Sequence, residues 1–375
     1  MCRILAERYT FYIMKTKIMN MSELVNAGEA SISCYLDEIP PFVEQALVES
    51  YETLHSSLPF FRTFRSVERA SCYVARRNGH QNTVLLFNFY NKRVDVLNEM
   101  IEIEQSEVDR FADYIFANFR QVDIISFKAL KTTAHESGFP FQRHNSKDTY
   151  VIALPETPAE YTESIAKSTR ADIRRQTRNV ARDFPSFKTE FFVNDEVCEE
   201  HIREIIGFSE RKINAKGVKF SHDAERIIAL ARMCGFVSVL FIDGRVCAGS
   251  VAYRVGSSYF GDVTGYDPEY EKYALGKLCI HQTIFESIVR GGTQYYLGGG
   301  VFDFKNKMAG ALLSMDELQI YRSHVKMLVN FDRVAGTFIA ACVGRLKKLL
   351  HQRKQEMWAR FVFKSFYFLT GKLTK

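Results

Sequence analysis

Residues 236–310 constrain the fold of this 375-residue chain more than any other segment. Short runs of β-branched and aromatic residues alternate here with the turn pairs Asp243-Gly244 and Gly256-Ser257, as in hairpin strands. An apolar helical pattern over residues 275–290 follows, and Gly291-Gly292 ends it. We therefore predict hairpin strands, then a helix, then a returning strand. Their expected ranges are 237–242, 246–254 and 259–264, then 275–290, then 294–297.

Residues 72–127 repeat this plan. Three short β-rich runs are separated by turns at Asn78-Gly79 and Asn91-Lys92. Ser106, with Asp109 three residues later, predicts the cap of a helix that runs to about Phe119. Residues 123–127 then read as a returning strand. We interpret the two segments as copies of one unit, with a chance likeness of two meanders as the alternative.

The rest of the chain alternates helices with short strands, so the predicted fold class is α+β. Expected helices cover 41–56, 162–183, 196–214 and 223–234, and expected strands cover 150–154 and 187–193. The predicted organisation is a poorly ordered leader, a degenerate first half, a second half that carries the chemistry, and a basic helical tail. The corresponding ranges are 1–29, 30–145, 146–324 and 325–375.

Composition excludes several classes of protein. The chain is 46% apolar and 25% charged, which is typical of a globular protein. Its eight cysteines lie far apart without a C-x-x-C pair, which argues against structural zinc and disulfide scaffolds and favours a reducing, cytoplasmic setting. The nine histidines lack metal-binding spacing, so no metal site is expected. The first residues become charged too early for a signal peptide.

The net charge of +6 is concentrated at the C-terminus. Residues 326–375 hold eleven Lys and Arg against two acidic residues, which leaves −3 for residues 1–325. Nucleic-acid binding by the whole body is therefore disfavoured. No stretch of the tail reaches the roughly 18 uncharged residues of a spanning helix. Two interpretations stay open: peripheral contact with an anionic membrane, on its inner face, or packing on the body or in a dimer.

The start of the helix at residue 275 is the strongest candidate for binding an anion. A strand ends in Gly265-Tyr266-Asp267-Pro268, and the helix opens after it with free backbone N–H groups that favour a pyrophosphate. The corresponding end in the first half carries three glutamates and no glycine. A glycine that only lets the helix pack on the sheet is the alternative. The predicted donor-binding residues are Lys272, Ala274, Leu275, Gly276 and Lys277.

Several motifs of the second half resemble a known family. The run Tyr296-Leu297-Gly298-Gly299-Gly300-Val301 with Asp303-Phe304-Lys305 is similar to the end of the acyltransferase domain shared by the GNAT superfamily and Fem-type peptidyltransferases, the BioF-like and FemAB-like group. Ala248-Gly249-Ser250 and residues 265–270 resemble its central hairpin, and residues 168–175 its entry helix. The resemblance covers about 150–310 and, in degenerate form, 30–130. It implies two tandem GNAT-like halves.

The resemblance also implies an activity. Members transfer an acyl or aminoacyl group to an amine or hydroxyl, often on cell-envelope glycans or their precursors. The implied enzyme is an acyltransferase that uses acyl-CoA as co-substrate, without a permanent cofactor, on a glycan or peptide-like acceptor of cell-envelope or exopolysaccharide synthesis. Only Gly276 fits the phosphate loop of GNAT proteins. An aminoacyl-tRNA donor and an inactive, membrane-associated regulatory or resistance factor therefore remain as alternatives.

Acyl transfer needs a base and a proton donor, and four residues are candidates. Strand alternation places Asp262 on the same sheet face as Phe260 and Thr264. If that face borders a cleft, the Asp262 carboxylate is a candidate general base. Tyr266 and Tyr296 are candidates for protonating the leaving thiolate, and Asp303 is a further acid. Their plainer roles are a hydrogen-bonded edge residue for Asp262, packing for the tyrosines and a helix cap for Asp303.

Substrate contacts are expected at two places. The resemblance implies that Lys305 reaches a phosphate, and Gly299 and Gly300 permit close backbone approach. Arginines at 170, 174, 175, 178 and 182 form a basic stripe on a predicted helix, with Arg170 and Arg174 as the candidate contacts to a phosphorylated acceptor or a tRNA backbone. A solvated helix face is the alternative for this stripe.

Overall fold

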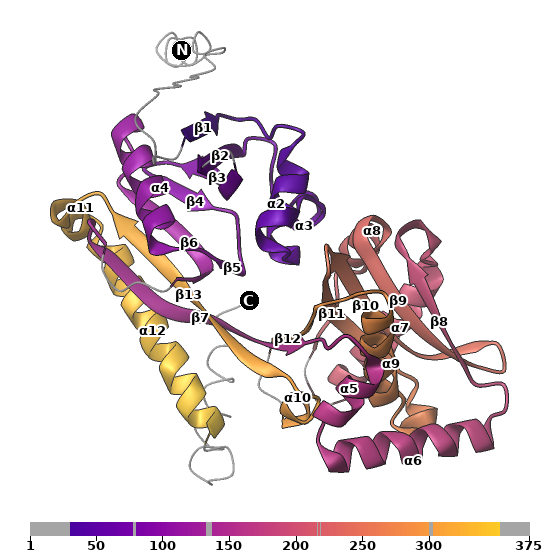
Figure 1. Cartoon of the computed structure of the whole chain (residues 1–375). Helices are drawn as coiled ribbons and strands as arrows, with labels where there is room; N and C mark the ends of the chain where they lie inside the picture. Colours follow the sequence, from indigo (N-terminus) through magenta and orange to yellow (C-terminus); the bar gives the residue numbers. More distant parts are fainter. Residues whose placement is uncertain are drawn as a thin grey trace, which may run out of the picture.

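A computed structural model of the chain describes residues 31–77, 80–132, 137–215, 217, 219–299 and 303–352. These residues form two lobes bridged by long strands (Figure 1). The strands of the first lobe are β1 (Ser31–Tyr35), β2 (Ser71–Arg77), β3 (His80–Tyr90), β4 (Arg93–Val96), β5 (Ile101–Glu102) and β6 (Ile124–Lys131). Those of the second are β8 (Lys188–Val193), β9 (Gly235–Ile242), β10 (Arg245–Val255), β11 (Ser258–Tyr266) and β12 (Gln294–Gly299). The bridging strands are β7 (Phe141–Ala153) and β13 (Ala311–Tyr321).

Within the described part of the chain, these thirteen strands make one continuous, mostly antiparallel sheet. Its order is β1-β2-β3-β4-β6-β13-β7-β12-β11-β10-β9-β8, with β5 beside β6. Helices cover both faces, so the predicted α+β class is confirmed. The helices are α2 (Val43–Tyr51), α3 (Leu58–Phe64), α4 (Gln105–Asn118), α5 (Pro158–Ser164), α6 (Lys167–Asp183), α7 (Glu199–Asn214), α8 (Ala224–Cys234), α9 (Leu275–Val289), α10 (Asp303–Lys307), α11 (His324–Val329) and α12 (Phe331–Gln352).

The topology confirms the predicted duplication and extends it. Each half contains an outer strand, two helices, a three-strand meander, a helix and a strand parallel to the last strand of the meander. The first copy runs from β1 through α2, α3 and α4 to β6, and the second runs from β8 through α7, α8 and α9 to β12. In both copies the parallel pair (β4 with β6, β11 with β12) is short.

The two halves exchange their final strands. The last strand of the second copy, β13, pairs with β6 of the first, while β7 of the first pairs with β12 of the second. β7 and β13 also pair with each other from Phe141 to Val151. The predicted boundary at residues 145 and 146 falls inside β7. The sequence did not indicate β13 or the first part of β7.

Among the described residues, four large hydrophobic clusters fill the spaces between sheet and helices, and a small fifth one lies around Met100. In the second half, the cluster of α5, α6 and α9 lies on one face and that of α7 and α8 on the other. The first half repeats this arrangement, with α4 on one face and α2 with α3 on the other. Packing of α7 on β11 is close, since a Cβ on Gly265 would lie 2.2 Å from the Ile205 carbonyl oxygen.

Three expected helices differ from the structure. The helix expected over 162–183 is divided into α5 and α6 at Ile165, whose backbone is extended (φ −75°, ψ 150°). The helix expected over 41–56 is interrupted, because Glu52 adopts a left-handed conformation (φ 44°) that ends α2, and a short 3₁₀ turn follows. Ser106 does not cap α4. The helix begins at Gln105 with Glu104 as its N-cap, so Ser106 lies inside the first turn. The Ser106 hydroxyl donates to the Glu104 carboxylate.

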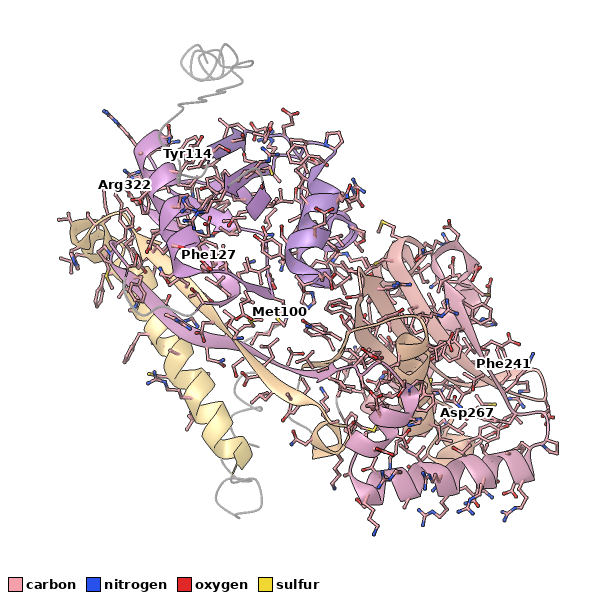
Figure 2. All side chains as sticks on the ribbon, in the orientation of Figure 1. Met100, Tyr114, Phe127, Phe241, Asp267 and Arg322 are labelled. Carbon is pink, nitrogen blue, oxygen red and sulfur yellow. The ribbon has the colours of Figure 1, made fainter. Side chains whose placement is uncertain are left out.

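Arg322, between β13 and α11, ties the C-terminal segment to the first half (Figure 2). Its guanidinium donates to the carbonyl oxygens of Val122, Phe116 and Phe119 at 2.6–2.7 Å. These last carbonyls of a helix and its following turn have no further helical partners, so the arginine satisfies the end of α4.

The predicted tail forms α11 and α12 as far as Gln352, and the remainder of 325–375 lies outside the described residues. Gln142 of β7 donates to the Val334 carbonyl of α12, which therefore packs along β7 (Figure 1). α11 and α12 also expose large apolar side chains: Val325, Leu328, Val329, Phe331, Phe338, Ile339 and Leu346. No helix in the described part of the chain is long and apolar enough to cross a membrane.

Candidate functional site

The sheet opens between β11 and β12. Parallel pairing covers only Ser258 to Phe260 against Gln294 to Tyr296. On its other edge β12 pairs with β7 along the same residues, and this pairing continues after a register shift, where Gly299 faces Thr149. A β-bulge adds to the separation, because Val251 faces Val263 whereas Ala252 faces Gly261. Asp262 is the extra residue of the bulge, which bends a strand and redirects its side chains.

A pocket of about 490 Å³ lies at this opening, between the two halves. β11, β12 and the α7–α8 connection supply one side, and the first half and β7 supply the other. Met100 of the first half lies at this junction (Figure 2). The polar side chains that line the pocket are His55, Lys147, Thr149, Ser221, His222, Asp223, Tyr253, Asp262 and Tyr296. The aromatic ones are Phe60, Phe64, Phe220 and Phe260, and the glycines are Gly261, Gly298 and Gly299.

Asp262 and Asp223 are the acidic groups of the pocket. Asp262 keeps solvent-exposed surface, but surrounding protein atoms desolvate its carboxyl. This desolvation raises the pKa of Asp262, and a hydrogen bond from the Tyr253 hydroxyl (3.0 Å) partly opposes the shift. Burial also raises the pKa of Tyr253 well above its usual value, so Tyr253 stays a donor. The carboxyl therefore binds a proton more readily than a solvated aspartate, as a general base requires.

The prediction that Asp262, Phe260 and Thr264 share one face of the sheet is only partly right. Asp262 and Phe260 both line the pocket, as expected. Thr264 lies on the other face, because the bulge shifts the alternation by one residue. Its hydroxyl bonds Ser250, whose strand partner Ser238 contacts α9.

The first half supplies two basic groups. Burial lowers the pKa of His55 to about 3, so this imidazole is neutral at physiological pH. Burial also lowers the pKa of Lys147 on β7, although Glu99, 4.0 Å away, favours its charged form. Glu99 is held by Arg65 and by the Ser56 hydroxyl. The pocket thus combines an anionic side, a neutral imidazole and a cation.

The two candidate tyrosines lie in different places. Tyr296 lines the pocket, stacks on Phe260 (4.5 Å between ring centroids) and donates to Gln294. Burial raises the pKa of Tyr296, which keeps it protonated. Tyr266 instead lies against the start of α9, 3.0 Å from the position of a Cβ on Gly276, with the Lys212 ammonium over its ring. Only Tyr296 therefore shares the pocket with Asp262.

Lys305 holds the glycine corner. Its ammonium donates to the carbonyl oxygens of Gly298 (2.8 Å) and Gly299 (2.5 Å), and the side chain is buried. Burial lowers the pKa of Lys305 to about 8, while the two acceptors favour the charged form. The lysine thereby fixes the backbone at the mouth of the opening. Gly300 and the Asp303 side chain lie outside the described residues.

The predicted phosphate corner at the start of α9 is only partly open. The N–H groups of Ala274 and Lys277 are bonded to backbone carbonyls, whereas those of Leu275 and Gly276 have no acceptor within the described segments. α6 packs over this end: Asp172 pairs with Lys277, and Asp183 accepts from Tyr273. Lys272 lies over the Tyr273 ring. None of these residues lines either pocket described here, so donor binding at this corner stays a prediction.

Arg170 and Arg174 line a second pocket, of about 640 Å³, between α5, α6 and α9. It lies on the α9 side of the sheet, away from Asp262. No group of three or more His, Cys, Asp or Glu suited to a metal occurs in the segments that the structure describes.

Sequence reasoning missed Tyr253, His55 and Lys147. Tyr253 and Asp262 lie nine residues apart on paired strands, so hairpin register could have indicated their contact. The bulge also had a signal, since a glycine inside a strand (Gly261) often marks one. His55 and Lys147 come from the other half, and no local pattern indicates them.

Comparison with known proteins agrees with this architecture. Residues 167–306 match the acetyltransferase (GNAT) domain family. The crystal structure of FemX aligns at a TM-score of 0.58 with 10% identity, over 78% of this chain and 98% of FemX. L-PGS from Bacillus licheniformis aligns at 0.46 with 13% identity, over 83% of this chain and 97% of its own. No curated protein matches the sequence.

The second half thus carries a GNAT acetyltransferase domain, and the whole chain has a GNAT and FemAB-like fold. A tandem GNAT protein from the clavulanic acid pathway also aligns, at a TM-score of 0.37 with 9% identity over 78% of this chain and 98% of its own. The fold that the sequence resemblance implied is confirmed, and the GNAT domain marks the chain as a transferase.

Proposed function

We propose that this transferase moves an acyl group from a carrier to an amine or hydroxyl of a cell-envelope or exopolysaccharide precursor, in the pocket between the halves. The position of Asp262 is the observation on which this proposal rests. Its carboxyl lies at the opening between β11 and β12, in a pocket that both halves line. Acyl-CoA is the proposed donor, and the acceptor is a glycan or peptide-like molecule.

In this proposal the acceptor enters the pocket and attacks the carbonyl carbon of the donor. Asp262 takes the proton that the amine or hydroxyl loses as the new C–N or C–O bond forms. The C–S bond to the carrier then breaks, and Tyr296 protonates the leaving thiolate. Solvent returns the proton to Tyr296 and removes the one on Asp262. The aromatic side chains that line the pocket limit access of water to the reacting groups.

The pocket composition supports a partly charged acceptor. Lys147 supplies a cation, 4.0 Å from the Glu99 carboxylate, and His55 and Thr149 add hydrogen-bonding groups. Phe60 and Phe64 give the same wall an apolar surface. A precursor with a phosphate or carboxylate near an apolar or sugar portion matches this combination.

Thermal-shift measurement with acetyl-CoA and longer acyl-CoAs tests the donor class, since a bound donor stabilises by about 2.7 kcal/mol at a hundred times its Kd. Gly276→Glu tests the predicted corner of Lys272 and residues 274–277: the fold should persist and donor affinity should fall. Unchanged affinity by calorimetry contradicts that location.

An aminoacyl-tRNA donor is the second candidate, since α6 carries arginines at 170, 174 and 178 beside a pocket. Retention of charged tRNA on a filter, weakening steeply with salt, supports it. Absence of retention at low salt excludes it. Turnover with any donor and acceptor excludes an inactive regulatory or resistance factor.

We also propose a peripheral position on the inner face of an anionic membrane, through residues 326–375. The apolar side chains exposed on α11 and α12 support it, together with the basic residues of the tail. Deletion of 326–375 should release the protein from sedimenting anionic vesicles. Equal sedimentation with and without the tail contradicts this position, and concentration-dependent dimers would assign the face to a second copy instead.

A further inference from the structure

The second pocket is a groove in the helix layer of the second half. α5 and its C-cap contribute Thr162 and Ile165, and α9 contributes His281 and Phe285. The groove-facing residues of α6 are Arg170, Ile173, Arg174, Thr177 and Arg178. No carboxylate lines the groove in the described part of the chain.

The arginines of α6 divide into two sets. Arg175 pairs with Asp172, and Arg182 pairs with Asp183. The three arginines of the groove, at 170, 174 and 178, form no ion pair with any carboxylate that the structure describes. They follow one another every four residues, about 6 Å along the helix, so their long guanidinium side chains from successive turns can converge on one phosphate group. The positive charge facing the groove is therefore uncompensated.

The opposite wall is aromatic. The His281 ring lies 5.0 Å from the Phe285 ring and 6.0 Å from the Tyr161 ring, measured between centroids. Burial lowers the pKa of His281 to about 4, so this imidazole presents a neutral ring. A cationic wall facing neutral aromatic rings fits a ligand with phosphates at one end and a planar base at the other.

The groove adjoins the opening of the sheet through α10. The N–H of Ala166, after α5, donates to the Lys307 carbonyl, and the Tyr161 hydroxyl donates to the Met308 carbonyl. Lys305 of the same short helix holds the glycine corner at the opening. One rigid element thus borders both the groove and the end of β12.

We propose that this groove binds a nucleoside phosphate, with the phosphates on Arg170, Arg174 and Arg178 and the base against His281 and Phe285. The choice of nucleoside chemistry rests on the proposed function, because acyl-CoA and aminoacyl-tRNA both carry adenosine and phosphate. The groove then holds the nucleotide part of the donor on one side of the sheet, while the acceptor occupies the pocket on the other.

Fluorescence anisotropy with mant-ADP, with CoA and a short single-stranded RNA as competitors, tests the site at about 50 mM salt. The double variant Arg174→Ala/Arg178→Ala should lose at least about tenfold in affinity. Arg182→Ala is the matched control, since it removes a paired arginine from the same helix. It should change affinity by less than about twofold. Equal losses in both variants mean non-specific charge attraction and overturn the site.

Phe285→Leu separates the two walls. It keeps apolar packing but removes the ring, so affinity for mant-ADP should fall while affinity for pyrophosphate stays unchanged. Stronger competition by RNA than by CoA identifies the nucleic-acid source, and the reverse identifies the free nucleotide. Failure of the wild-type protein to bind any of the probes at about 1 mM overturns the proposal.

Asp262→Asn distinguishes this inference from the proposed function. This variant should bind mant-ADP like the wild-type protein while losing transfer. Transfer that persists in the arginine double variant, with unchanged KM for the donor, rejects the groove and leaves the proposed reaction intact. Thermal melts of every variant confirm folding.

Discussion

Replacing Asp262 with asparagine tests the chemistry of the pocket most directly. A positioned general base contributes about 10²–10⁴-fold in rate, or about 3–5 kcal/mol of the activation barrier. Asparagine has nearly the same shape as aspartate. Its amide oxygen can still accept the hydrogen bond from the Tyr253 hydroxyl, which in the wild-type protein lies 3.0 Å from the carboxylate. We therefore expect kcat to fall by at least about a hundredfold while the fold and the KM values persist. Steady-state transfer with an active donor and acceptor pair measures this.

The same variant makes a second, independent prediction about stability. Because burial raises the pKa of Asp262 above its ordinary value of 3.8, the folded protein binds a proton there more tightly than the unfolded chain. The wild-type protein therefore loses stability, relative to Asp262→Asn, as pH rises from near 3.8 through the raised pKa. We compare the free energy of unfolding of both proteins by denaturant titration at several pH values. The pH dependence of the difference isolates the contribution of Asp262, since the other groups are the same in both proteins.

Asp262→Ala is the control for packing. It leaves the buried Tyr253 hydroxyl without its acceptor and should cost about 1–3 kcal/mol of unfolding free energy, which the asparagine variant avoids. Transfer within about tenfold of wild type in Asp262→Asn would refute its role as the base. A stability difference that does not change with pH would refute the raised pKa.

Three further outcomes follow from contacts described above. Tyr253→Phe removes the hydrogen bond that lowers the pKa of Asp262, so the acidic limb of the pH–rate profile should move to higher pH; an unmoved limb contradicts the coupling. Gly265→Ala forces a Cβ against a carbonyl of α7 and should cost about 3 kcal/mol or more by denaturant unfolding, whereas Gly138→Ala, with nothing within 4 Å, should change stability by less than about 0.5 kcal/mol. Arg322→Leu removes a donor from three carbonyls, of which Phe119 keeps the bond from the Val122 N–H, and should cost about 2 kcal/mol; a loss below about 1 kcal/mol would mean that water replaces the guanidinium.

Local patterns predicted the meanders but not the strands that join them. β10 and β11 follow from β-branched residues around a tight turn, because alternation and turn chemistry act over a few residues. The first part of β7 is polar, with Arg143, His144, Asn145 and Lys147 in succession. It becomes a strand through pairing with β13, about 170 residues away along the chain. Such pairing is a tertiary effect that residue propensities do not encode.

The part of the candidate site that lies on locally predictable strands could also be predicted from the sequence. Asp262 and Tyr296 follow from the strands that carry them, and both line the pocket. The predicted common face of Phe260 and Thr264 failed because one extra residue reverses alternation beyond a bulge. The sequence indicated the arginines of α6 as one basic stripe. Only the structure distinguishes Arg174, which lines the groove, from Arg175, which pairs with Asp172.

The exchange of β7 and β13 bears on how this protein can be divided. A fragment cut at the middle of β7 would separate β13 from β6 and from the first part of β7. It would leave β6 and most of β13 each with a bare row of backbone donors and acceptors, which invites aggregation. Neither copy is therefore an independent module, and gene fragments that encode one alone should express as insoluble material. Each half instead completes a sheet edge of the other, β13 beside β6 and β7 beside β12.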